Sequence, residues 1–164
     1  MAPVAIARRH VLRLLSLGLG SSLIAPRPAK AAYAVSYPDA VWRQRLSPEA
    51  YAVLRQAATE KPFTSPLYTE KRRGTYHCAG CDQALFRSQD KYDSGTGWPS
   101  FKQAIAGALG TQTDYKLILP RTEYHCSRCG GHQGHVFDDG PPPTGKRYCN
   151  NGVALSFHPA KTQV

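Results

Sequence analysis

The alternation of apolar and polar positions predicts one clear helix near the start of the folded region. Ser47-Pro48-Glu49 supplies a capping hydroxyl, a first-turn proline and a first-turn acid, which together are typical of a helix N-terminus. Apolar residues then recur at helical spacing from Tyr51 to Ala57 or Ala58. The segment Thr59-Glu60-Lys61-Pro62-Phe63 ends the helix.

After this helix, glycines and prolines divide the chain into short segments rich in β-branched and aromatic residues. The pattern indicates a mainly β fold with one or two N-terminal helices. The segments predicted as strands are Thr75–His77, Ala84–Phe86, Asp114–Leu119, Thr122–His125, His135–Phe137 and Val153–Phe157.

The first 31 residues have the organisation of an export signal. Arg8-Arg9 precedes an apolar run from Leu14 to Ala25, and Ala29-Lys30-Ala31 follows as an A-x-A cleavage site. The apolar run is too short for a membrane span of ~30 Å, so no stable membrane anchor is expected. The paired arginines resemble a twin-arginine signal, which predicts a periplasmic protein. Import into an organelle is the alternative, because the segment is rich in arginine and lacks acids.

The chain is therefore divided into four parts. Residues 1–31 are a cleaved signal peptide, 32–46 an N-terminal extension, 47–159 the folded domain and 160–164 a tail. The formal net charge is +10, and half of this excess lies in residues 1–31. The basic run Lys71-Arg72-Arg73 is interpreted as a solvated turn, and no nucleic acid partner is expected.

Four of the five cysteines form two C-x-x-C pairs, Cys78 with Cys81 and Cys126 with Cys129. Two such pairs are typical of a closed tetrahedral zinc site, so we expect one structural Zn²⁺ per chain. A pair of disulfides is the alternative, and export would permit it. Because 44 residues separate Cys81 from Cys126, a sheet must bring the pairs together, and one hairpin is not enough. The expected fold is thus two antiparallel sheets in a compact, zinc-stabilised β-barrel or sandwich.

Cys149 is the thiol left for chemistry. If its segment is a strand, Arg147 and Asn151 lie on the same face, where a cation favours the reactive thiolate and an amide can donate a hydrogen bond. His132 and His135 offer imidazoles for proton transfer, although such a pair can also be structural. A lone cysteine can equally be a small buried residue. Trp98, in a glycine-rich loop, can line a pocket or pack in the core.

From about Ser47 to Pro159 the chain resembles the methionine-R-sulfoxide reductase B family. The resemblance implies reduction of the R epimer of methionine sulfoxide in oxidised proteins, which is a protein repair reaction under oxidative stress. The resembling strings, apart from the two cysteine pairs, are Thr59–Phe63, Lys91–Phe101, His132–Phe137, Asp139–Pro141 and Arg147–Asn151.

The resemblance also implies roles for single residues. Cys149 attacks the sulfoxide sulfur and becomes a sulfenic acid, with Arg147 and Asn151 beside it. His132 and His135 bind the oxygen and deliver a proton. The residues expected to bind the substrate are Trp98, against the methyl group, together with Asp139 and Phe101.

Three positions depart from the family pattern. Thr96 stands where many members carry a resolving cysteine, so an external thiol must reduce the sulfenic acid. A thioredoxin-like protein is the expected reductant and glutathione the alternative. Gln133 replaces the usual Leu, and Asn150 replaces the usual Ile or Val. The competing hypotheses are a zinc-knuckle module that binds nucleic acid or protein, and a non-enzymatic domain of the same fold.

Overall fold

The computed structural model describes residues 33–161, so the predicted signal peptide lies outside the described residues. Two helices, α1 (Asp39–Arg45) and α2 (Pro48–Gln56), precede nine short strands. None of the helices within this range has the length and apolar content needed to cross a membrane. The strands are β1 (Gly74–Cys78), β2 (Ala84–Arg87), β3 (Lys91–Tyr92), β4 (Ser100–Phe101), β5 (Leu109–Asp114), β6 (Arg121–Cys126), β7 (His132–Phe137), β8 (Arg147–Asn150) and β9 (Leu155–Pro159).

Helix α2 begins where the sequence predicts and ends at Gln56, one residue before the predicted Ala57. The Ser47 hydroxyl accepts a hydrogen bond from the backbone nitrogen of Ala50 at 3.1 Å, and Pro48 is the first helical residue. Ala57 stops the helix in the left-handed conformation, with a φ of 52°. Helix α1 lies in the predicted extension and buries Trp42.

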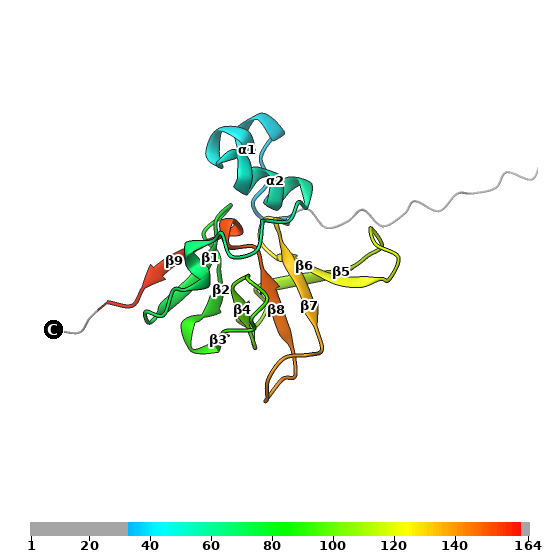
Figure 1. The fold of residues 1–164 in the computed structure, drawn as a ribbon. Coiled ribbons are helices and arrows are strands. Elements are labelled where there is room, and N and C mark those ends of the chain that lie inside the picture. Colours follow the sequence, from blue (N-terminus) through cyan, green and yellow to red (C-terminus); the bar gives the residue numbers. More distant parts are fainter. Residues whose placement is uncertain (1–32, 162–164) are drawn as a thin grey trace, which may run out of the picture. The chain divides into compact units, whose positions relative to one another are not determined.

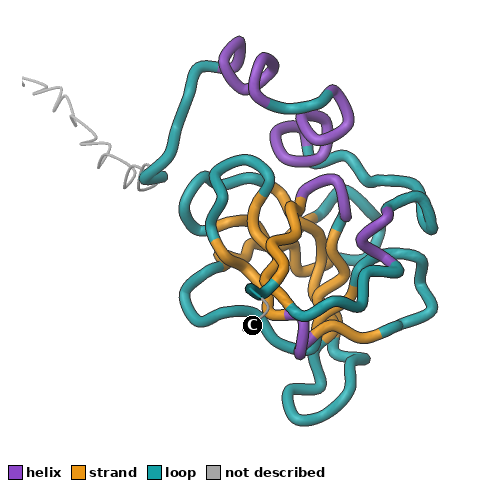
Figure 2. Tube along the Cα trace, turned by 90° about the vertical axis from the view of Figure 1, so that its left-hand side faces the viewer, coloured by secondary structure: helices purple, strands orange, loops and turns teal. Residues whose placement is uncertain are grey.

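The strands form two antiparallel sheets, as predicted. One has three strands in the order β2-β1-β9, and the other has six in the order β3-β4-β8-β7-β6-β5. The larger sheet does not close, because β3 and β5 are its two edges, so the fold is a sandwich and not a barrel. Both helices lie together at one end of the strands (Figures 1 and 2).

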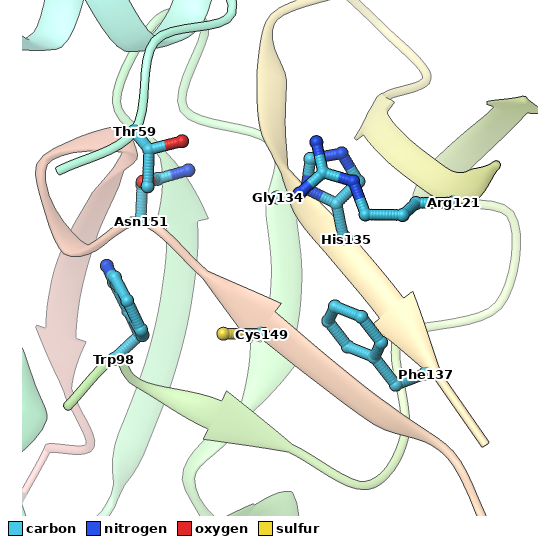
Figure 3. A pocket seen from close by; sticks show the side chains of 8 residues that line it. All are labelled: Thr59, Trp98, Arg121, Gly134, His135, Phe137, Cys149 and Asn151. Carbon is cyan, nitrogen blue, oxygen red and sulfur yellow. The ribbon is translucent and has the colours of Figure 1, made fainter. Parts of the chain in front are cut away.

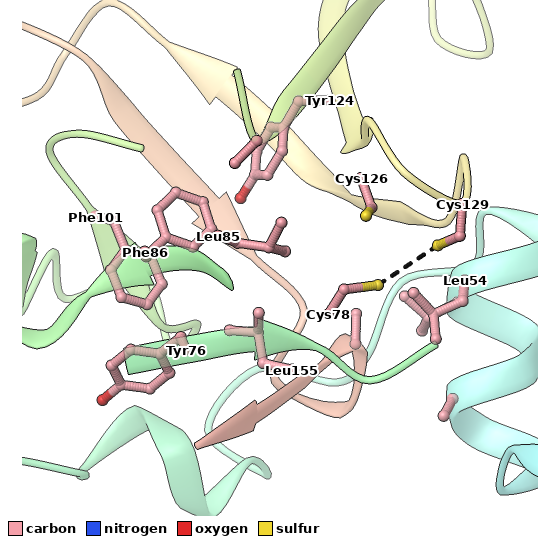
Figure 4. Close-up of a cluster of buried hydrophobic side chains, with 14 of the residues drawn as sticks. Leu54, Tyr76, Cys78, Leu85, Phe86, Phe101, Tyr124, Cys126, Cys129 and Leu155 are labelled. Carbon is pink, nitrogen blue, oxygen red and sulfur yellow. Dashed lines mark hydrogen bonds between the residues drawn. The ribbon is translucent and has the colours of Figure 1, made fainter. Parts of the chain in front are cut away.

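Aromatic side chains from both sheets fill the space between them (Figure 4). The rings of Phe86 and Phe101 stack at 4.2 Å, and Tyr76 meets Phe101 edge-on at 4.9 Å. Tyr124 is also fully buried. Burial of one such ring stabilises the fold by about 2–3 kcal/mol, so these rings hold the two sheets together.

The predicted strand Asp114–Leu119 is wrong. The strand of this region is the more polar β5, whose pairing with β6 ends where Asp114 faces Arg121. The Asp114 carboxylate accepts a hydrogen bond from the backbone nitrogen of Lys116 at 2.9 Å, which turns the chain out of the sheet. Residues 115–119, which are apolar apart from Lys116, form the exposed connection. At the C-terminus, Gly152–Ala154 forms a 3-10 turn, so the last strand starts two residues later than predicted.

Candidate active site and metal centre

The two cysteine pairs lie in the hairpin turns of different sheets. Cys78 and Cys81 occupy the turn between β1 and β2, whereas Cys126 and Cys129 occupy the turn between β6 and β7. The four sulfurs therefore meet where the two sheets face each other. Figure 4 shows Cys78, Cys126 and Cys129 close to Leu54 of helix α2. As predicted, one hairpin does not suffice to bring them together.

The sulfur geometry fits a metal ion and not a pair of disulfides. The Sγ atoms of Cys78 and Cys129 are 3.6 Å apart, and those of Cys81 and Cys126 are 3.5 Å apart. A disulfide requires about 2.05 Å. A tetrahedral site with metal–sulfur distances of about 2.3 Å places its sulfurs about 3.8 Å apart. All four ligand atoms lie within 4.8 Å of one another, so this cluster can hold a metal ion.

The two unusual polar residues, Gln133 and Asn150, are hydrogen-bonded to each other beside this cluster. The Gln133 amide donates to the Cys78 Sγ at 3.3 Å, and its carbonyl accepts from the Asn150 amide at 3.3 Å. The Asn150 carbonyl in turn accepts from the Tyr124 hydroxyl at 2.9 Å. This buried network connects the cysteine cluster to the residue that follows Cys149.

Cys149 lies on β8 and is not part of the cysteine cluster. It faces Ser100 of β4 on one side and His135 of β7 on the other, so the three side chains share one face of the large sheet. A cavity of about 130 Å³ opens over this face (Figure 3). Its lining residues are Thr59, Trp98, Arg121, Gly134, His135, Phe137, Cys149 and Asn151.

The segment after helix α2 holds one wall of this cavity in place. The Trp98 indole nitrogen donates to the backbone oxygen of Glu60 at 2.9 Å. The Asn151 carbonyl accepts from the backbone nitrogen of Glu60 at 2.9 Å, and its amide donates to the backbone oxygen of Gln133 at 3.0 Å. Asn151 thus holds the wall in place. Strand alternation predicts that its amide points towards Cys149, but the amide is bonded to Gln133 instead.

Each histidine is held by its own carboxylate. Nε2 of His135 lies 2.8 Å from Asp114 Oδ2, and Nδ1 of His132 lies 2.7 Å from Glu123 Oε1. Burial lowers the pKa of His135, and the bond to Asp114 opposes this shift. His135 lines the Cys149 cavity. His132 does not, and its ring lies 5.5 Å from that of His135.

Burial affects the pKa of the Cys149 thiol more strongly than the neighbouring Arg147 cation does. Burial raises the pKa of Cys149, while Arg147 and the Thr96 hydroxyl act to lower it. Arg147 thus acts in the predicted direction but does not dominate. Its guanidinium makes two 2.8 Å hydrogen bonds to Asp139. Asp139 is largely exposed and does not line the cavity.

Phe101 was expected to bind the substrate, but it lies in the core. It is fully buried and stacks on Phe86, so it supports the core and cannot contact a substrate. Its neighbour Ser100 faces the opposite side of the sheet, towards Cys149. The sequence did not reveal the carboxylates of Asp114 and Glu123, although acids in short strands are unusual enough to have indicated them.

The comparisons with known proteins identify the family of the chain. The family model described as the SelR domain matches residues 46–159. The chain belongs to this family. It is 54% identical over 122 residues to the peptide methionine sulfoxide reductase MsrB of Thiobacillus denitrificans, covering 74% of this chain and 92% of that protein. The MsrB of Agrobacterium fabrum is 49% identical over 126 residues, which are 76% of this chain and 93% of that protein.

A plant relative matches more of the chain. The protein named peptide methionine sulfoxide reductase B1, chloroplastic, of Arabidopsis thaliana is 43% identical over 159 residues, covering 93% of this chain and 79% of its own length. The chain is thus a member of the MsrB group of peptide methionine sulfoxide reductases. The SelR domain match contains both the cysteine cluster and the Cys149 cavity.

Proposed function

We propose that this protein reduces the R epimer of methionine sulfoxide in oxidised proteins, with Cys149 as the nucleophile. The observation that carries the proposal is the separation of Cys149 from the four clustered cysteines. It lies in a cavity walled by Trp98 and His135, large enough for one side chain.

In the first step, the Cys149 thiolate attacks the sulfoxide sulfur. This forms a bond between Cys149 Sγ and the substrate sulfur while the sulfoxide oxygen takes up a proton. The resulting hydroxyl then passes from the substrate sulfur to Cys149 Sγ as the sulfur–sulfur bond breaks, so methionine leaves and Cys149 becomes a sulfenic acid. His135 is the proton donor in this scheme, because its ring lies beside Cys149 and is oriented by Asp114. The negative thiolate next to it favours the protonated ring. His132 supports the position of His135 through their ring contact.

Choice of the R epimer needs three fixed contacts. The methyl group packs on the Trp98 ring, the oxygen lies towards His135, and the sulfur lies in line with Cys149. The hydrogen bond from Trp98 to Glu60 makes the first contact rigid. The S epimer would place its oxygen against the indole.

Regeneration requires an outside reductant. Thr96 stands where many family members carry the resolving cysteine, and its hydroxyl interacts with the Cys149 thiol by a hydrogen bond that lowers the pKa of Cys149. One thiol of a thioredoxin-like protein attacks the sulfenic acid and releases water. Its second thiol then frees Cys149 and leaves the reductant as a disulfide. Glutathione is the alternative reductant.

We also propose that the cysteine cluster holds one structural Zn²⁺. Four thiolates in a closed shell leave no position for substrate, so the ion would stabilise the fold. For location, we propose export to the periplasm through the twin-arginine segment. Import into an organelle remains the alternative, and the relative named as chloroplastic covers nearly the whole chain.

The decisive experiment measures reduction of both epimers of a peptide methionine sulfoxide with dithiothreitol as the reductant. We expect turnover of the R epimer only. The variant Cys149→Ser should lose activity while it keeps its far-ultraviolet circular dichroism and its metal content. Preference for the S epimer, or equal activity of Cys149→Ser, would contradict the proposal.

A further inference from the structure

The loop between β5 and β6, residues 115–119, exposes a group of large apolar side chains beside the Cys149 cavity. These side chains, between 57% and 102% exposed, are Tyr115, Leu117, Ile118 and Leu119. Only two other large apolar side chains among residues 33–161 are exposed, those of Tyr37 and Phe63. A contiguous exposed apolar group is typical of a binding surface. We propose that this loop and the cavity next to it bind apolar residues that flank the methionine sulfoxide of an extended polypeptide, a proposal that rests on the proposed function.

The cavity next to the loop shares part of its wall with the Cys149 cavity. It has a volume of about 290 Å³, and Tyr115 and Leu117 line it. The residues that line both cavities are Thr59, Arg121 and His135. Figure 3 shows His135 on the side of Cys149 away from Trp98. A polypeptide that leaves the Cys149 cavity past His135 therefore enters the second cavity directly.

The strand register places both cavities over one face of the large sheet. Gln112 of β5 is paired with Glu123 of β6, and Glu123 with His135 of β7. His135 is in turn paired with Cys149 of β8, and paired residues point to the same face. Three strand spacings separate Gln112, which lines the second cavity, from Cys149, a distance of about 14 Å. An extended chain covers this distance with about four residues, so the cavity lies within reach of the near neighbours of the sulfoxide.

Hydrogen bonds fix the base of the loop to the active site. Oδ2 of Asp114 accepts a hydrogen bond from Arg121 at 2.7 Å and lies 2.8 Å from Nε2 of His135. The Lys116 ammonium group donates to the backbone oxygen of Ala57 at 3.3 Å. Lys116 is the one charged residue of the loop, so its bond to the end of helix α2 leaves the apolar side chains to form the open surface. A surface that is already ordered loses little conformational freedom on binding.

The chemistry of the reaction explains why apolar neighbours would be recognised. Methionine is most often buried in folded proteins, so residues near it in sequence commonly belong to the same core. When such a methionine becomes accessible to the enzyme in an extended segment, its apolar neighbours are accessible as well. The polar side chains of Gln112 and Thr113, which line the same cavity, can bond to the peptide backbone.

The test measures the binding of labelled peptides to Cys149→Ser by fluorescence anisotropy, so that no turnover takes place. One peptide has leucines within four positions of a methionine-R-sulfoxide, a second has serines there, and a third has its leucines more than eight positions away. We expect the first to bind about ten-fold more tightly than the other two, because its leucines leave water. Adding Tyr115→Ser and Leu117→Ser should reduce this difference to about two-fold or less. Adding Tyr37→Ser, an exposed apolar residue that lines neither cavity, is the matched control and should retain it.

Three results would overturn the proposal. The first is equal binding, or no binding, of the three peptides by Cys149→Ser. The second is a ten-fold difference that persists without Tyr115 and Leu117. The third is a dimer that becomes a monomer when these two side chains are removed, because the surface would then bind a second copy of the chain. Failure of the proposed function would appear separately, as absence of R-epimer turnover by the unaltered protein, since the binding constants require no reaction.

Discussion

The charge state of Cys149 depends on two opposing neighbours on its own side of the sheet. Burial raises the pKa of its thiol, Arg147 lowers it, and the Asp139 carboxylate raises it again. The raised pKa keeps the thiol mostly protonated at neutral pH, while the reaction also needs a protonated His135, whose pKa burial lowers. The profile of kcat/KM against pH should therefore be bell-shaped, with its alkaline limb set by the pKa of Cys149. This balance can be shifted in either direction by one substitution.

Arg147→Gln removes the cation, so the pKa of Cys149 should rise further and the pH profile of kcat/KM should move to higher pH. Asp139→Asn removes the opposing carboxylate and should move the profile to lower pH. Arg87→Gln, a change on the other sheet, should leave the profile in place. If the pH profile stays unchanged in both active-site variants, burial alone sets the pKa of the Cys149 thiol.

Thr96 is close enough to Cys149 for a cysteine at this position to act as the resolving thiol. Its hydroxyl hydrogen-bonds to the thiol and also to Ser94 at 2.8 Å. We expect Thr96→Cys to form an intramolecular disulfide with Cys149 after one turnover without reductant, because the two sulfurs would be neighbours. The unaltered protein should instead accumulate the sulfenic acid. Mass spectrometry of alkylated peptides distinguishes the two, and Thr96→Ser is the control without a thiol.

Site residues within recognisable sequence motifs could be predicted from the sequence. Site residues that reach the cavity from distant segments could not. Cys149, Trp98 and His135 meet in one cavity as expected. Thr59 and Arg121 reach the same cavity from a loop and from a distant strand, and no local pattern indicates this. Phe101 was misjudged because adjacent strand residues face opposite sides, so only one of Ser100 and Phe101 can face Cys149.

At the scale of elements, capping chemistry proved more informative than apolar content. Ser47 and Pro48 located helix α2 correctly, since their effect is local. The apolar run after Asp114 favoured a strand, but the carboxylate of Asp114 and the proline at 120 direct the chain away from the sheet. Pairing with β6 selects the polar residues before it instead. Tertiary pairing thus overrode local propensity.

The network between β7 and β8 leads to a prediction about both strands. Gln133→Leu should leave the Asn150 amide without one of its buried partners, and Asn150→Val should do the same to Gln133 and Tyr124. Each change should lower the free energy of unfolding by about 1–3 kcal/mol. The double variant removes both partners of the pair, so its loss should be smaller than the sum of the single losses.

Urea unfolding of the four proteins in this cycle measures the coupling. Val153→Ala, which shortens a partly buried side chain outside the network, serves as the control for lost packing. Strictly additive losses would mean that the hydrogen bond between Gln133 and Asn150 contributes nothing to stability. Zinc content measured alongside shows whether the bond from Gln133 to Cys78 matters to the metal cluster.

At the scale of the whole molecule, the cysteine cluster lies where the two sheets meet. The sequence predicted that these four cysteines come together and that a contact between distant segments is needed for this. It did not predict which strands carry the ligands, since the order of strands in a sheet depends on contacts between distant segments. Cys78 comes from the small sheet and Cys126 from the large one, and Figure 4 shows both at the end of the core nearest helix α2.

Removal of the proposed Zn²⁺ should therefore separate the sheets and not merely loosen one turn. Four thiols brought together without an ion lose the bonds that offset their ordering, and the aromatic core between the sheets is left to hold them alone. We expect a strong chelator to lower the melting temperature steeply and to abolish activity, with recovery when Zn²⁺ is restored under reducing conditions. Cys126→Ser should behave like the chelated protein, whereas Cys149→Ser should melt like the unaltered one. If the chelated protein kept its melting temperature, the core alone would account for the pairing of the sheets, and the cluster would have to serve another purpose.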